Sequence, residues 1–290
     1  MPLPKNIFLA APLFFLLVSS SYAAQSAIME SQGYACLGED KSRKQTEQAA
    51  LADAKRNASE AALTYIKSET SVKNYAIEKD LIDAYANAAI KVIHETEKVW
   101  YKDQSMGDCY RVRIKAEVAP QEEALSRATR NKDTIDDPSA PLTVRIWSDK
   151  ADYKQGDAIK LYIKGNKPFY ARVVYRDAGG NNVQLLPNPF RIENYFNGGV
   201  VYEIPSGHDS FALVVSPPFG SEDVTVYAST TQVGEISLQA AGGVYQVLTK
   251  PADVGVMTRG VQIQSGAGGT KPQVAEFAEE KATVKTEKQP

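Results

Sequence analysis

Short alternating runs of apolar residues, separated by turn-forming residues, fill the chain from Leu142 onward. Glycine, proline and aspartate lie between the runs, and these residues favour tight turns. Strands at such regular spacing are typical of antiparallel sandwiches. The spacing therefore predicts an all-β, immunoglobulin-like sandwich over residues 142–286. We expect its strands near residues 142–146, 159–163, 169–175, 183–186, 200–204, 211–215, 224–228, 260–264 and 277–284, with a glycine-rich loop before the last.

The preceding segment, residues 24–120, has a different pattern and predicts an α+β domain. A capping box formed by Ser42 and Gln45 starts a long helix, whose apolar stripe consists mainly of alanine. Small side chains on that stripe let a helix pack very close to a sheet. We predict one long alanine-rich helix on a small antiparallel sheet, with strands at 28–37, 91–102 and 109–118 and a second helix at 77–89.

A charged stretch over residues 121–141 reads as a linker between the two domains. Asp133, Asp136 and Asp137 precede prolines in a polar context, where we expect solvated carboxylates rather than an acid–base pair, which needs burial to tune it. The last residues, 287–290, are predicted to form a disordered tail.

The first 23 residues have the features of a secretory signal peptide. Lys5 precedes an apolar run from Ile7 to Val18, and small residues follow, which predicts cleavage after Ala23. The run is short for a membrane span, so a retained anchor is the weaker alternative. No later run is long enough to cross a bilayer, and no cysteine lies at the cut to carry a lipid. We expect a periplasmic or outer-envelope protein.

The two cysteines, Cys36 and Cys109, both fall in the first mature domain, on predicted strands. In an oxidising compartment such a pair favours a disulfide, with two free or buried thiols as the alternative. The bond would close a loop of about seventy residues and contribute roughly 3–4 kcal/mol in the chain-entropy model. A redox role is disfavoured because no Cys-x-x-Cys spacing occurs.

The C-terminal half resembles a bacterial β-sandwich family that is described only as a domain of unknown function. The matching residues are Tyr153–Asp157, Leu185–Asn188, the segment Pro-Pro-Phe-Gly-Ser-Glu at 217–222, and Thr258–Val261. The resemblance implies a β-sandwich and an exported envelope protein, or a module attached to caspase-like peptidases or kinases. It implies no activity.

The N-terminal half is similar, more loosely, to the N-terminal class of envelope lipoproteins and the flagellar-assembly protein T. The matching features are Gly33-Tyr34-Ala35, the helical segment Ala50–Ala54 and the closing Tyr110-Arg111-Val112. The chain lacks the lipobox cysteine that lipoprotein members carry, so the resemblance does not imply a lipid anchor.

Catalytic and metal-binding patterns are sparse. His94 and His208 lie in different predicted domains, and their spacing does not match a zinc site. Asp149, Asp152 and Asp157 surround one turn; calcium binding is the alternative to ordinary turn chemistry. No nucleophile elbow, phosphate loop or dinucleotide fingerprint occurs. We therefore predict no enzyme, no cofactor and no bound metal.

Three aromatic residues, Phe190, Tyr195 and Phe196, lie in a long predicted loop, where they either attach the loop to the sandwich or bind a ligand or partner. With a net charge of −2 and no basic stripe interleaved with aromatics, nucleic acid and anionic membranes are poor partner candidates. We predict an exported, non-enzymatic envelope protein that serves assembly or protein–protein interaction. The alternative is binding of peptidoglycan or surface polysaccharide through this loop.

Overall fold

The computed structural model describes residues 24–39, 41–70, 75–129, 134–260 and 274–289. The predicted signal peptide, most of the strand predicted at 260–264 and the glycine-rich loop after it lie outside these ranges. Among the helices in the described ranges, none combines the length and the hydropathy that a membrane crossing requires.

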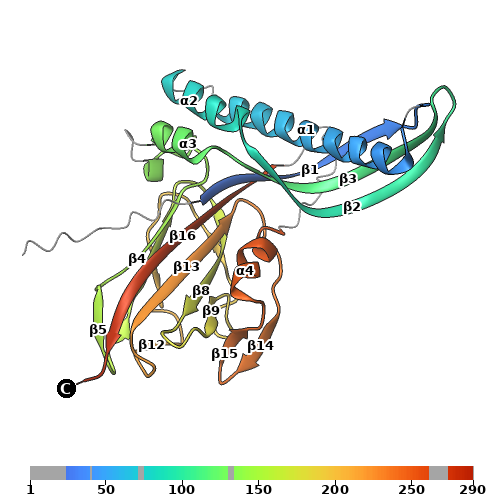
Figure 1. Cartoon of the computed structure of the whole chain (residues 1–290). Helices are drawn as coiled ribbons and strands as arrows, with labels where there is room; N and C mark the ends of the chain where they lie inside the picture. The colour runs from blue at the N-terminus through green and yellow to red at the C-terminus, as the bar shows by residue number, and fades with distance from the viewer. Residues whose placement is uncertain (1–23, 40, 71–74, 130–133, 261–273, 290) are drawn as a thin grey trace, which may run out of the picture.

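One large, mainly antiparallel sheet runs through both halves of the chain and curls into a half-barrel (Figure 1). The last strand, β16 (Val274–Glu287), lies between β1 (Ala24–Cys36) from the N-terminus and β13 (Ser221–Ser229) from the C-terminal half. The first strand continues the sheet through β3 (Gly107–Ala119) to the edge strand β2 (Ala89–Asp103). The two halves therefore share a single hydrogen-bonded framework.

Helix α1 (Arg43–Thr70) covers one face of β1 and β3, as the alanine stripe predicts. The predicted capping box is present: the Gln45 backbone N–H donates to Ser42 Oγ, and the Ser42 N–H donates to Gln45 Oε1. The helix lies so close to β1 that a Cβ atom on Gly33 would be 2.2 Å from the Ala54 nitrogen. The helix residues fully buried there are Ala50, Ala54, Ala58 and Ala62.

The predicted linker is partly structured, and its Asp133 lies outside the described residues. Helix α3 (Glu122–Thr129) lies within it and packs beside α2 (Tyr75–Ala86). Ala124 and Leu125 are buried in the same core as α1, because the short helix is amphipathic despite its high charge. Asp136, in the short 3-10 turn Thr134–Asp136, forms an ion pair with Lys164, and Asp137 accepts hydrogen bonds from Ser139.

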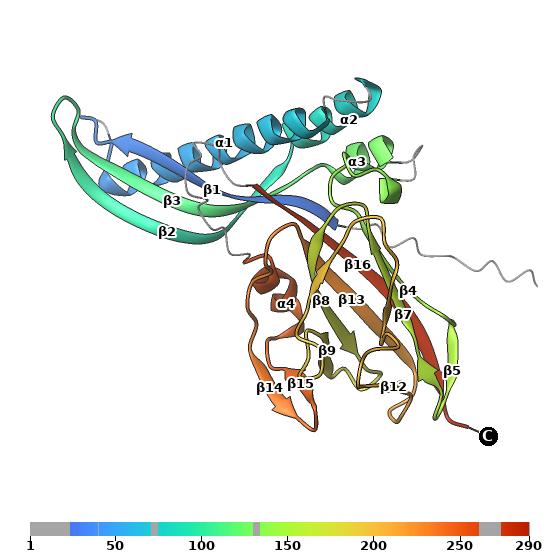
Figure 2. The same cartoon turned by 180° about the vertical axis from the view of Figure 1, so that it is seen from behind.

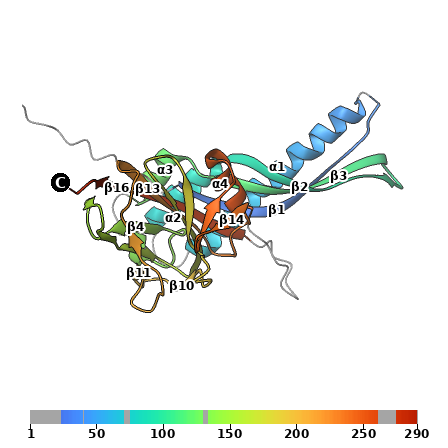
Figure 3. The same ribbon diagram turned by 90° about the horizontal axis from the view of Figure 1, so that it is seen from below.

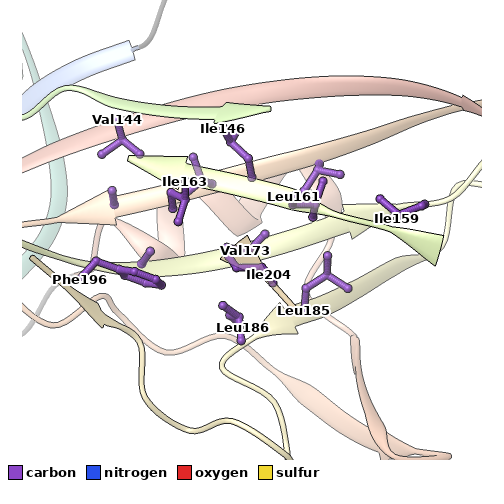
Figure 4. Close-up of a cluster of buried hydrophobic side chains, with 14 of the residues drawn as sticks. Val144, Ile146, Ile159, Leu161, Ile163, Val173, Leu185, Leu186, Phe196 and Ile204 are labelled. Atoms are coloured by element: carbon purple, nitrogen blue, oxygen red, sulfur yellow. The ribbon is translucent and has the colours of Figure 1, made fainter. Parts of the chain in front are cut away.

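Two sheets enclose the core of the C-terminal half (Figure 4). A three-stranded sheet, in the order β11–β7–β4, packs against the large sheet at β8, β9, β13 and β16. The remaining bounds here are β4 (Val144–Ser148), β5 (Asp152–Lys154), β6 (Ala158–Ile159), β7 (Leu161–Gly165), β8 (Phe169–Arg176), β9 (Asn182–Leu186), β10 (Tyr195–Phe196), β11 (Tyr202–Ile204) and β12 (Leu213–Val214). Each predicted strand between residues 142 and 228 overlaps at least one of these elements or β13. Strand β16 continues to Glu287, which pairs with Lys154 of β5.

Three elements beyond β13 have no counterpart in the sequence prediction. Strands β14 (Leu238–Ala241) and β15 (Val244–Val247) extend the large sheet past β9, and helix α4 (Pro251–Thr258) covers part of the face opposite to α1 (Figure 2). Next to α4, Arg259 forms ion pairs with Glu117 of β3 at 2.6 Å and Glu279 of β16 at 2.9 Å. These pairs connect α4 to both halves of the sheet.

A buried carboxylate lies at the boundary between the cores of the N-terminal and C-terminal halves, on the α1 side of the sheet. Glu276 of β16 is 3% exposed and accepts hydrogen bonds from Tyr65 of α1 (2.8 Å) and from the Leu142 backbone N–H (2.5 Å). Lys167 pairs with the same carboxylate at 3.0 Å. Burial, together with the Glu276 charge, raises the pKa of Tyr65, so this hydroxyl remains a protonated donor.

The predicted disulfide is present and joins Cys36 to Cys109. The two residues are directly opposite each other in the β1–β3 register, close to the far end of the hairpin formed by β2 and β3. The bond therefore secures the first strand at the end of the sheet that is farthest from the C-terminal half (Figure 3).

The close approach of α1 to β1 gives a direct test of this packing. A Gly33→Ala substitution places a methyl group against the helix backbone, so we expect it to lower the free energy of unfolding by about 1–3 kcal/mol. Gly38→Ala is the matched control because a Cβ there has no neighbour within 4 Å. Urea denaturation of both variants measures the difference, and equal midpoints would show that the helix can move away at no cost.

Candidate functional site

The three aromatic residues singled out from the sequence do not form one surface. Phe196 is completely buried, with its ring centroid 5.1 Å from that of Phe169. Tyr195 is 49% exposed and lies beside Tyr170, and Phe190 is 51% exposed and stacks on Phe211. Strand alternation explains the split, because adjacent residues of β10 point to opposite faces. Only Phe190 and Tyr195 can contact a ligand or partner without unfolding the loop.

An apolar pocket opens at one end of the sandwich core. Its volume is about 250 Å³, and it lies between the β6–β12 pair and the strands β7, β8, β9, β13 and β15. Figure 4 shows Ile159, Leu161 and Leu185 toward this end of the buried cluster. The lining residues are Ile159, Leu161, Tyr175, Val183, Leu185, Ala212, Leu213, Val214, Ser216, Val224 and Val244.

Exposed apolar side chains surround the mouth of this pocket. Val214 of β12 is 55% exposed and Val244 of β15 is 41% exposed, and both also line the pocket. The Phe190 ring lies against the β14–β15 turn, since a Cβ on Gly243 would be 3.2 Å from it. We call Phe190, Val214 and Val244 the apolar rim. Their side chains form a continuation of the pocket lining onto the surface.

The Tyr175 hydroxyl at the pocket has a partner within the fold. Tyr175 donates its hydroxyl to Glu222, which is 2% exposed and also accepts a hydrogen bond from Thr286. Burial, reinforced by the Glu222 carboxylate, raises the pKa of Tyr175, so the phenol stays protonated. This arrangement can bind an apolar group while the Tyr175 hydroxyl is hydrogen-bonded to Glu222.

Most of the pocket lies in a segment of the chain that matches a family model. Residues 152–232 match a family model described as a domain of unknown function, DUF4384. The C-terminal half therefore contains a bacterial domain of unknown function. The match includes Phe190, Val214 and every residue that lines the pocket except Val244. No curated protein and no solved structure matches the chain significantly.

The aspartates proposed as the calcium alternative mainly stabilise their own turn. Asp149 accepts hydrogen bonds from the Tyr153 hydroxyl at 2.6 Å and the Lys160 backbone N–H at 3.0 Å. Burial raises the pKa of Asp149, but these hydrogen bonds outweigh it and hold that pKa below its usual value. Asp157 accepts from the Lys154 N–H, and Asp152 is exposed at the start of β5.

The two histidines are exposed and lie in separate places, His94 on β2 and His208 in the turn after β11. Within the ranges that the structure describes, no three His, Cys, Asp or Glu side chains are grouped in a way that could hold a metal ion.

A second hollow, of about 460 Å³, lies between α1 and the strands β2 and β3. Its walls are polar, and several of its charges already have partners: Lys98 pairs with Glu95 at 2.9 Å, and Glu47 accepts a hydrogen bond from Trp100. The apolar pocket differs from it because its rim residues Phe190, Val214 and Val244 are apolar and exposed. We therefore take the apolar pocket and its rim as the candidate site.

Sequence reasoning identified one rim residue, Phe190, and missed the pocket. Val214 lies in a strand that was predicted at 211–215. Val244, on the other side of the pocket mouth, lies in β15, which was not predicted. The alternation of apolar residues around Val244 is a usable signal for β15. That signal gives no indication that β12 and β15 lie on either side of one opening.

The different environments of the adjacent rings predict different effects on stability. Phe196→Ala removes a fully buried ring, so we expect it to lower the free energy of unfolding by about 3–5 kcal/mol. Tyr195→Ala removes a half-exposed ring, and we expect a loss below about 1 kcal/mol. Thermal and urea denaturation compare the two variants. Similar losses for both would show that the loop rings act as one packed unit.

Proposed function

We propose that this protein is an exported, non-enzymatic component of a bacterial cell envelope and acts as a protein–protein interaction module. The observation that carries the proposal is the apolar pocket with its exposed rim of Phe190, Val214 and Val244. Exposed apolar groups around a concave apolar site are the usual features of a docking site for a partner side chain. The partner would insert an aliphatic or aromatic side chain between β12 and β15.

The composition of the pocket favours a protein partner over a glycan. Sugars are held by hydrogen-bonding side chains placed around an aromatic platform, and here Ser216 and Tyr175 are the lining residues that carry a polar side chain. The half-exposed rings of Tyr195 and Phe190 support glycan stacking as the second candidate. In that case binding would depend on Tyr195 and not on Val214.

One feature supports export: the Cys36–Cys109 disulfide is the kind of bond that persists in an oxidising compartment. A periplasmic or outer-envelope location follows from this proposal.

We also propose finer relationships for each half. The facing sheets around the C-terminal core support an immunoglobulin-like arrangement of residues 142–286. The long alanine-lined helix on β1 and β3 supports a relationship of the N-terminal half to the envelope-lipoprotein and flagellar-assembly protein T class.

Export makes a direct prediction about the N-terminus. In a bacterial host, the protein recovered from outside the cytoplasm should begin at Ala24 and contain the Cys36–Cys109 bond. Mass spectrometry of the intact, non-reduced protein measures both properties. A retained Met1, or alkylation of both cysteines without prior reduction, would contradict the proposal.

The docking proposal is tested by placing charge at the rim. Val214→Asp and Val244→Asp should each weaken binding of the partner at least ten-fold, because a carboxylate would have to be desolvated in the complex. The partner is identified with a photo-crosslinking residue at position 214, and its affinity is then measured with purified proteins. Stability should change little, since both positions are exposed.

Matched controls exist on other parts of the surface. Leu248 is 55% exposed and Met257 is 42% exposed, close to the values for Val214 and Val244, and neither lines the pocket. Leu248→Asp and Met257→Asp should leave partner affinity unchanged. Equal losses from rim and control variants would contradict the proposal, and recovery of glycan alone, with binding lost in Tyr195→Ala, would establish the second candidate.

A further inference from the structure

The face of the β1–β3–β2 sheet that is turned away from α1 carries a row of cationic and aromatic side chains. Alternate residues of β3 bury against the helix, so Arg111, Arg113 and Lys115 point to the opposite side. Tyr34 of β1 lies directly across from Arg111, and it is 57% exposed. We call this surface the open face; Figure 3 shows the strands and α1 extending away from the C-terminal half.

The register brings groups together that are far apart in the sequence. Arg111 lies 5.8 Å from the centre of the Tyr101 ring and donates a hydrogen bond to Glu97 at 2.7 Å. Arg113 lies 3.6 Å from the same carboxylate and contacts Gln32 at 3.4 Å. Arg111 therefore lies between Tyr34 and Tyr101, and the Glu97 carboxylate is shared by Arg111 and Arg113.

This surface is accessible and has excess positive charge. The side chains of Arg111 and Arg113 are 41% and 45% exposed. Apart from the buried Glu117–Arg259 pair, the described face has more cations than carboxylates, four against three; the cations are Lys91, Arg111, Arg113 and Lys115, and the carboxylates are Glu30, Glu97 and Asp103.

We propose that the open face binds an acidic polysaccharide. Exposed tyrosines offer flat faces for sugar rings, arginines pair with acidic groups on the sugars, and Glu97 and Gln32 accept hydrogen bonds from sugar hydroxyls. The choice of polysaccharide over nucleic acid rests on the proposed export.

The test uses polygalacturonate as the acidic probe, neutral dextran as the uncharged probe and oligo-dT as the nucleic acid. The intact mature protein should bind polygalacturonate with an affinity that falls as salt rises, and should bind dextran and oligo-dT at least ten-fold more weakly. Arg111→Gln combined with Arg113→Gln should weaken polygalacturonate binding at least ten-fold. The slope of log affinity against log salt should decrease by about two, one for each cation removed.

Two further variants make the result specific. Arg56→Gln is the matched control, because Arg56 on α1 is also exposed and also contacts two carboxylates, Asp53 and Glu60; it should change binding less than two-fold. Tyr34→Ala should weaken binding without changing the salt slope, and it provides an independent test should the double variant lose stability. Val214→Asp should leave this binding unchanged, which separates this proposal from the docking proposal.

Equal binding of dextran, stronger binding of oligo-dT, or equal effects of Arg56→Gln and the double variant would each overturn the assignment.

Discussion

The pairing of the last strand with the first is the constraint on which the rest of this structure depends. Strand β16 forms hydrogen bonds to β1 on one side and to β13 on the other, so neither half has a complete sheet without it. The same strand places Glu276 where a carboxylate is removed from water. A buried charge needs partners, and here they come from both halves, Tyr65 on α1 and Lys167 beyond β7.

Close helix packing determines the shape and the accessibility of the N-terminal half. Because Gly33 and the alanine stripe let α1 lie directly on β1, the helix covers one face of β1 and β3. An antiparallel sheet needs only one buried face, so the other can be polar. That second face carries Arg111, Arg113 and the exposed tyrosines, and the disulfide between Cys36 and Cys109 secures its outer end.

The segment matched by the family of unknown function is not a closed structural unit in this chain. Its core includes Val144 and Ile146 of β4 and Val284 of β16, all outside residues 152–232. Glu222, in the Pro-Pro-Phe-Gly-Ser-Glu segment, accepts a hydrogen bond from Thr286 of β16. This conspicuous sequence motif therefore has a structural role: it attaches the matched segment to the C-terminal strand. The surface that we propose for docking lies elsewhere, at the apolar rim.

Local periodicity in the sequence determined the elements: the capped alanine-rich helix, the strands with residues alternating between two faces, and the compatibility of Cys36 with Cys109. Such patterns depend on neighbours within a few residues, so they can be read along the chain. Only the tertiary structure decided which strands are neighbours. Spacing does not encode the insertion of β16 beside β1, the helix within the charged 121–141 segment, the opening between Val214 and Val244, or the row of Arg111, Tyr34 and Tyr101. Each of these features arises from contacts between segments that are distant in sequence. Such contacts bury apolar surface and supply the partners that buried charges need.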